Sequence, residues 1–157
     1  MADDHVMHHH PTRTETRGLS VFYALFVGGF LTIIGIAGFF VDAHFDSVHQ
    51  KGFLGLWDVN GWFDTVHLVA GLLGLLSVRL APRAYAGILG VFWIVYAVWG
   101  FYNDLGDDVV SGLPSSVGAN WLHLALGILG IAAAAHGYFV SDSPRHDDHA
   151  AGTGRGF

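Results

Sequence analysis

Four long apolar runs, separated by shorter polar segments, dominate the pattern of hydrophobic and polar positions along the chain. They cover about 19–41, 62–78, 84–102 and 119–140. An α-helix rises about 1.5 Å per residue, so roughly 20 apolar residues cross a bilayer core about 30 Å thick. The pattern therefore predicts an all-α integral membrane protein, a bundle of four transmembrane helices.

The segments outside these runs are polar. Residues 1–17 show no apolar periodicity, and residues 141–157 are polar and rich in glycine. Such segments bury too little apolar surface to fold, so we expect a four-helix domain over 18–140 between two disordered tails. The first run is too long for the apolar part of a signal peptide and is expected to remain as an anchor. The short apolar stretch Gly52–Trp57 is expected at the interface or against the bundle.

The basic residues predict the orientation of the helices. Six arginines fall on the side that holds both termini and the turn between the second and third helices, whereas Lys51 alone falls on the other side. Short cytoplasmic loops and flanks carry the excess of lysine and arginine. Both termini are therefore expected in the cytoplasm.

The composition excludes several classes of site and function. The chain is 52% hydrophobic and 13% charged, and it contains no cysteine, so disulfides, thiolate metal sites and cysteine nucleophiles are excluded. A net charge of −6 offers no basic patch for nucleic acid. No predicted helix has an acidic or basic residue near its middle, and no phosphate-binding or hydrolase motif occurs. We expect no enzyme.

The two halves of the chain match each other in two registers, which predicts two repeated helical hairpins. At an offset of 62, six residues of the first helix and its end recur in the third: Tyr23, Ala24, Gly28, Gly38, Phe39 and Asp42 fall on Tyr85, Ala86, Gly90, Gly100, Phe101 and Asp104. At an offset of 56, residues of the second helix recur in the fourth: His67, Leu68, Gly71 and Gly74 fall on His123, Leu124, Gly127 and Gly130. Because both hairpins start from the same side, they form a parallel repeat.

Each predicted helix carries a pair of glycines three residues apart. Small residues let neighbouring backbones approach closely in membrane bundles, so we interpret these glycines as helix-packing positions: Gly35, Gly38, Gly71, Gly74, Gly87, Gly90, Gly127 and Gly130.

Two histidines are the strongest candidates for chemistry. His67 and His123 sit near the outer starts of their helices, and Asp64 and Asn120 precede them by three residues. One interpretation is capping, since aspartate and asparagine accept hydrogen bonds from backbone N–H groups at helix starts. The other pairs the two imidazoles across the bundle, where they hold a haem b iron, bind a divalent metal or pass protons.

The motifs resemble a known family. Residues 53–60, 66–71 and 119–127, which include both histidines, are similar to the domain of unknown function 4383 family, uncharacterised four-helix membrane proteins of actinobacteria and related prokaryotes. The resemblance covers about 18–140 and implies a multi-pass protein of a prokaryotic cell membrane. In the family an asparagine stands three residues before each histidine, whereas this chain has Asp64 in the first motif.

The leading hypothesis is a small structural or accessory membrane protein without a cofactor. Its expected partners are the lipid bilayer and other membrane proteins, or a second copy bound through the glycine-lined faces. The alternative is a haem- or metal-binding redox protein that uses His67 and His123. A weaker alternative, suggested by the repeat alone, is a small transporter.

Overall fold

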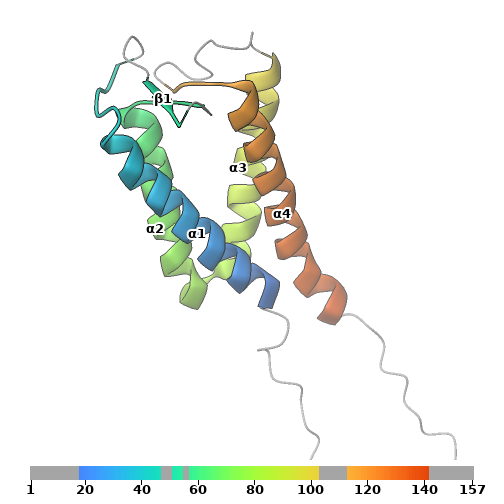
Figure 1. The fold of residues 1–157 in the computed structure, drawn as a ribbon. Coiled ribbons are helices and arrows are strands. Elements are labelled where there is room, and N and C mark those ends of the chain that lie inside the picture. The colour runs from blue at the N-terminus through green and yellow to red at the C-terminus, as the bar shows by residue number, and fades with distance from the viewer. Residues whose placement is uncertain (1–17, 47–50, 55–56, 103–112, 142–157) are drawn as a thin grey trace, which may run out of the picture.

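The computed structural model describes residues 18–46, 51–54, 57–102 and 113–141. Its four helices are α1 (Gly18–Phe39), α2 (Gly61–Leu80), α3 (Pro82–Tyr102) and α4 (Val117–Ser141) (Figure 1). Each is long and apolar enough to cross a membrane, so the chain is a multi-pass membrane protein by helix length and composition. The segments predicted as tails, 1–17 and 142–157, lie outside the described residues.

The helices pack as two hairpin pairs, α1 with α2 and α3 with α4. The start of α1, the α2–α3 turn and the end of α4 lie at one end of the bundle (Figure 1). At that end Ala81 alone separates α2 from α3. Pro82 suits the first position of α3 because its missing N–H has no partner to lose there.

The other end of the bundle carries a small sheet, so the expectation of an entirely helical protein is wrong in one detail. Strands β1 (Lys51–Phe53) and β2 (Trp57–Val59) pair antiparallel, with Gly52 opposite Asp58. The stretch that we expected at the interface or against the bundle therefore contributes the end of β1 and the start of β2. The fold is mostly helical.

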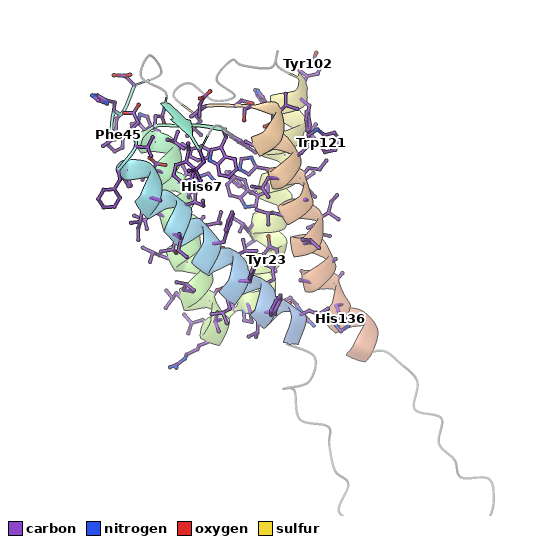
Figure 2. The ribbon with its side chains drawn as sticks, in the orientation of Figure 1. Tyr23, Phe45, His67, Tyr102, Trp121 and His136 are labelled. Carbon is purple, nitrogen blue, oxygen red and sulfur yellow. The ribbon has the colours of Figure 1, made fainter. Side chains whose placement is uncertain are left out.

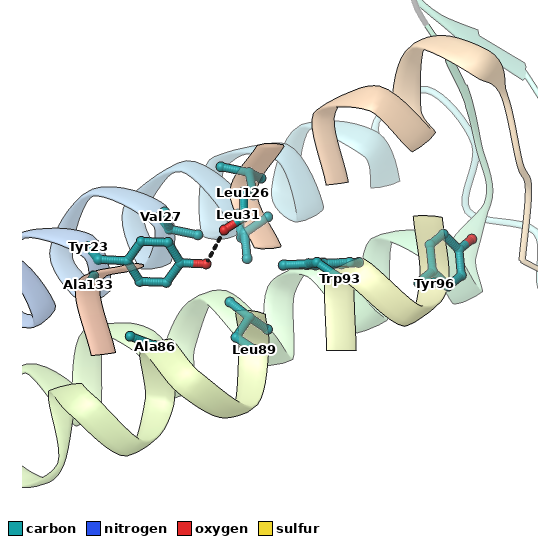
Figure 3. Packing of buried hydrophobic residues seen from close by; sticks show 9 residues of the cluster. All are labelled: Tyr23, Val27, Leu31, Ala86, Leu89, Trp93, Tyr96, Leu126 and Ala133. Carbon is teal, nitrogen blue, oxygen red and sulfur yellow. Dashed lines mark hydrogen bonds between the residues drawn. The ribbon is translucent and has the colours of Figure 1, made fainter. Parts of the chain in front are cut away.

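The apolar core lies between the two hairpins (Figure 3). Its fully buried members include Leu31 of α1 and Trp93 of α3. Two tyrosine hydroxyls bridge the hairpins within this region: Tyr23 donates to the carbonyl of Leu126 at 2.9 Å, and Tyr85 donates to the carbonyl of Ala70 at 3.0 Å. Paired in this way, the hydroxyls avoid the cost of unsatisfied polar atoms inside a bilayer.

Candidate functional site

Most of the predicted packing glycines lie in close contacts between neighbouring helices. A methyl group at Gly35 would lie 2.6 Å from the backbone nitrogen of Leu68, and one at Gly90 would lie 2.9 Å from the carbonyl oxygen of Gly127. Side chains at these positions would therefore push the paired helices apart. The same close approach, with a neighbouring atom within 3.0 Å, holds for five further predicted packing positions: Gly38, Gly71, Gly74, Gly127 and Gly130.

Gly87 differs from the other predicted packing positions. A methyl group there would make only an ordinary contact, 3.6 Å from the Cβ atom of Ala134. The tight glycines face the partner helix of their own hairpin or the other hairpin, so they are not free to bind a second protein. Association through glycine-lined faces, as the sequence suggested, is therefore not how the structure uses them.

Helix capping is not the role of Asp64. The N-cap of α2 is Asn60, whose side-chain oxygen accepts from the backbone N–H of Phe63 at 2.9 Å. At the start of α4, Ser116 Oγ accepts from the N–H of Ala119 at 3.4 Å. α2 begins at Gly61 and α4 at Val117, so Asp64 and Asn120 are the fourth residues of their helices and lie past the N-cap position.

Asp64 and Asn120 instead lie between the helices of their own hairpins, and both are completely buried. Asp64 packs against Gly38, and Asn120 packs against Gly100, where in each case a methyl group would collide with the polar side chain. Asn120 Nδ2 donates to Ser115 Oγ at 3.1 Å. Neither carboxyl oxygen of Asp64 has a hydrogen-bond partner in the described part of the chain.

His67 and His123 come together in the interior of the bundle, between the two hairpins. Both are buried, with 4% and 2% of their surface exposed, and their ring centroids lie 5.8 Å apart. Figure 2 shows His67 within a group of side chains near the end that carries the sheet. His67 Nδ1 lies 2.8 Å from the carbonyl oxygen of Phe63, which only accepts. This nitrogen therefore carries the hydrogen, and His67 reaches back to its own helix rather than to Asp64.

Trp93 completes the group, although its sequence context did not predict a place at the site. Its indole stacks on the His123 ring at 4.4 Å between centroids and 4° between planes, and it lies 5.3 Å from the ring of His67. Tyr96 meets His123 edge-on at 5.2 Å, and its hydroxyl donates to the carbonyl of Pro114. The sequence carries one signal for Trp93. At the offset of 62 it stands where the first helix has Leu31.

This packing bears on whether His67 and His123 can hold haem or a divalent metal, the two cofactors that the sequence suggested. A haem does not fit between the rings, because Trp93 stacks directly on His123 and the cavity beside the histidines measures about 10 Å³. A metal ion finds too few ligands: in the described part of the chain, no three histidine, aspartate, glutamate or cysteine side chains converge on a common point. Protein zinc sites use three or four such ligands.

Comparison with known proteins gives a family match over most of the chain. A family model described as Domain of unknown function (DUF4383) matches residues 22–136. The chain belongs to the DUF4383 family. The DUF4383 match spans both histidine motifs and part or all of each helix. No curated protein and no solved structure matches the chain.

Proposed function

We propose that this DUF4383 protein is a small structural or accessory subunit of the membrane, without enzymatic activity, that associates with other membrane proteins or with itself. The observation that carries the proposal is a pair of apolar grooves on the outside of the bundle. One runs between α2 and α3 and has a volume of about 410 Å³. The other runs between α1 and α4 and has a volume of about 460 Å³.

The two grooves occupy matching places on the bundle, each between one helix of the first hairpin and one helix of the second. Ile88 lines the first groove, and Phe26 lines the second. These residues are equivalent at the offset of 62, and both are largely exposed. Helices associate in a bilayer through close van der Waals packing rather than through a hydrophobic driving force. A hollow that admits side chains of another helix is therefore a favourable place for association.

The interior supports an accessory role over a catalytic one. Trp93 and Leu31 are almost fully buried and belong to the packed core between the hairpins. A substrate pocket, by contrast, is generally a cleft of about 300–1,000 Å³ with a few polar groups that converge on the ligand. The polar residues His67 and His123 border a space of only about 10 Å³.

Cysteine cross-linking in native membranes tests the proposal, since the natural chain has no cysteine. Phe26→Cys and Ile88→Cys place a thiol in each groove, and Val95→Cys places one on an exposed position outside both grooves. We expect a bifunctional thiol reagent to give a discrete cross-linked product with the groove variants only. Mass spectrometry then identifies the partner as a second copy or another protein. Monomer alone in all three variants, or equal linking at Val95, contradicts the proposal.

We further propose that both termini and the α2–α3 turn face the cytoplasm of a prokaryotic cell. The distribution of six arginines against one lysine supports this orientation. Asp58→Cys and Ala81→Cys place single thiols at exposed positions in β2 and in the α2–α3 turn. In intact cells, an impermeant thiol reagent is expected to label the first variant and not the second. The reverse result contradicts the orientation.

We also propose that the two hairpins are copies of one ancestral unit. Beyond the matching sequence, the bonds from Tyr23 to Leu126 and from Tyr85 to Ala70 join equivalent positions in the two registers. The capping residues Asn60 and Ser116 are likewise 56 residues apart. Duplication of a hairpin explains why residues far apart in the sequence make equivalent contacts.

A further inference from the structure

Residues that border the small cavity beside the two histidines carry buried polar atoms without partners in the described part of the chain. His67, His123 and Trp57 all border it, together with apolar residues such as Leu31 and Phe63. His123 Nδ1 and Trp57 Nε1 are buried and have no hydrogen-bond partner in the described part of the chain. Each such group costs free energy unless a partner is supplied.

The third group is the free ring nitrogen of His67. Its Nδ1–H donates to the carbonyl of Phe63. A neutral imidazole has one donor and one acceptor nitrogen, so Nε2 of His67 is an acceptor. The indole of Trp57 is only a donor, and His123 Nδ1 donates or accepts according to its tautomer. The ligand that satisfies all three must therefore both donate and accept.

The volume of the cavity limits how large its ligand can be. Its volume is about 10 Å³, close to the smallest space that holds one water molecule, and buried waters typically make about three hydrogen bonds. We propose that a single ordered water occupies this cavity, accepts from Trp57 Nε1–H, donates to His67 Nε2 and bonds to His123 Nδ1. A bare metal ion matches the walls less well, because the indole N–H presents a hydrogen, not a lone pair.

The water links three separate elements at the sheet-bearing end of the bundle. His67 belongs to α2, His123 to α4 and Trp57 to β2. The water therefore joins the two hairpins to each other and to the sheet through hydrogen bonds. His67, His123 and Trp57 line neither external groove, so cross-linking and water binding can fail separately.

Nuclear magnetic resonance on the full chain in detergent micelles tests the site. We expect dipolar cross-peaks from a long-lived water to the indole N–H of Trp57 and to the ring protons of both histidines. The indole N–H of Trp93 is an internal control, because it is also buried and has no partner among the residues that the structure describes, but Trp93 does not border the cavity. The ¹⁵N shifts should report a His67 ring protonated at Nδ1. Absence of the water cross-peaks in the folded wild-type protein overturns the proposal.

Two variants sharpen the test. Trp57→Phe removes the donor, and Ala119→Val adds methyl groups to another residue that borders the cavity; each is expected to abolish the water cross-peaks at the histidines. Trp121→Phe changes an exposed indole on α4 and should preserve them. If the cross-peaks persist in Ala119→Val, the water is not in this cavity. If equimolar Zn²⁺ shifts the ring signals of both His67 and His123 in the wild-type chain, the site takes a metal and the proposal is wrong.

Discussion

Trp93 and His123 form a nearly parallel stack, with ring centroids 4.4 Å apart and planes that differ by 4°. The contact joins α3 to α4 within the second hairpin, and the same indole also lies beside His67 of the first. One aromatic side chain thus lies beside both histidines. Aromatic pairs of this kind add about 0.5–1.5 kcal/mol beyond the area that they bury.

Trp93→Ala should therefore destabilise the bundle strongly. The side chain is 1% exposed, and truncation of a buried tryptophan leaves a cavity that costs about 3 kcal/mol or more. We expect a clear fall in the unfolding midpoint in detergent, with loss of the near-ultraviolet circular dichroism of the stacked rings. Val91→Ala, at an exposed position of the same helix, is the control and should change the midpoint little. Equal effects from the two substitutions would show that the stack carries no stability.

Asp64→Asn should leave the protein as stable as the wild type or make it more stable. Asp64 is fully buried and its carboxyl oxygens lack hydrogen-bond partners in the described part of the chain. Burial of a charge without a partner is costly, and an amide of the same shape removes the charge. Thermal unfolding at neutral pH measures the change, with Asp58→Asn on the exposed face of β2 as the control.

The converse substitution, Asn120→Asp, should destabilise the protein by about 1–3 kcal/mol. Asn120 donates to Ser115 Oγ, and aspartate in its place loses this donor and introduces a charge. A loss of stability in Asp64→Asn as large as that in Asn120→Asp would mean that the carboxylate of Asp64 has a charged partner that the substitution removes.

Neighbouring glycines should respond to alanine in opposite ways. A methyl group at Gly28 would lie 2.9 Å from the backbone nitrogen of Leu75, whereas no atom of the described residues lies within 4 Å of one at Gly29. Gly28→Ala should force α1 away from α2 and cost about 1–3 kcal/mol. Gly29→Ala should be neutral or slightly stabilising, because alanine is the better helix former. The measurement is the unfolding midpoint of both variants in the same detergent, and similar values would contradict the helix contact.

The pattern of the sequence was enough to predict the four helices, because apolar runs of membrane-spanning length have few other structures available. Pairing of His67 and His123 across the bundle was one of two interpretations of the sequence, and the other, capping by Asp64, was wrong because Asn60 caps α2. The cap at Asn60 was missed because Gly61, a poor helix former, obscured the first turn of α2. The sheet was missed because its strands have three residues each. The stack of Trp93 on His123 depends on how the helices pack, which periodicity does not reveal.

Tyr23→Phe and Tyr85→Phe should have equal and modest effects, which makes them a test of the proposed duplication. Each hydroxyl donates to a backbone carbonyl of the other hairpin, Leu126 for Tyr23 and Ala70 for Tyr85. Hydrogen bonds between membrane helices contribute about 0.6 kcal/mol on average and up to about 1.7 kcal/mol. We expect each single substitution to cost an amount in this range.

The double substitution decides whether the two bonds act as equivalent halves of one interface. The phenol rings of Tyr23 and Tyr85 are 6.3 Å apart, close enough for the losses to couple rather than add. If the hairpins separate as a unit, removal of both hydroxyls should lower the unfolding midpoint by an amount that differs from the sum of the single losses. Tyr102→Phe, at an exposed position near the end of α3, provides the baseline for loss of a hydroxyl alone. A large loss from one tyrosine and none from the other would mean that only one hairpin depends on the bridge, and the proposed equivalence of the two copies would fail.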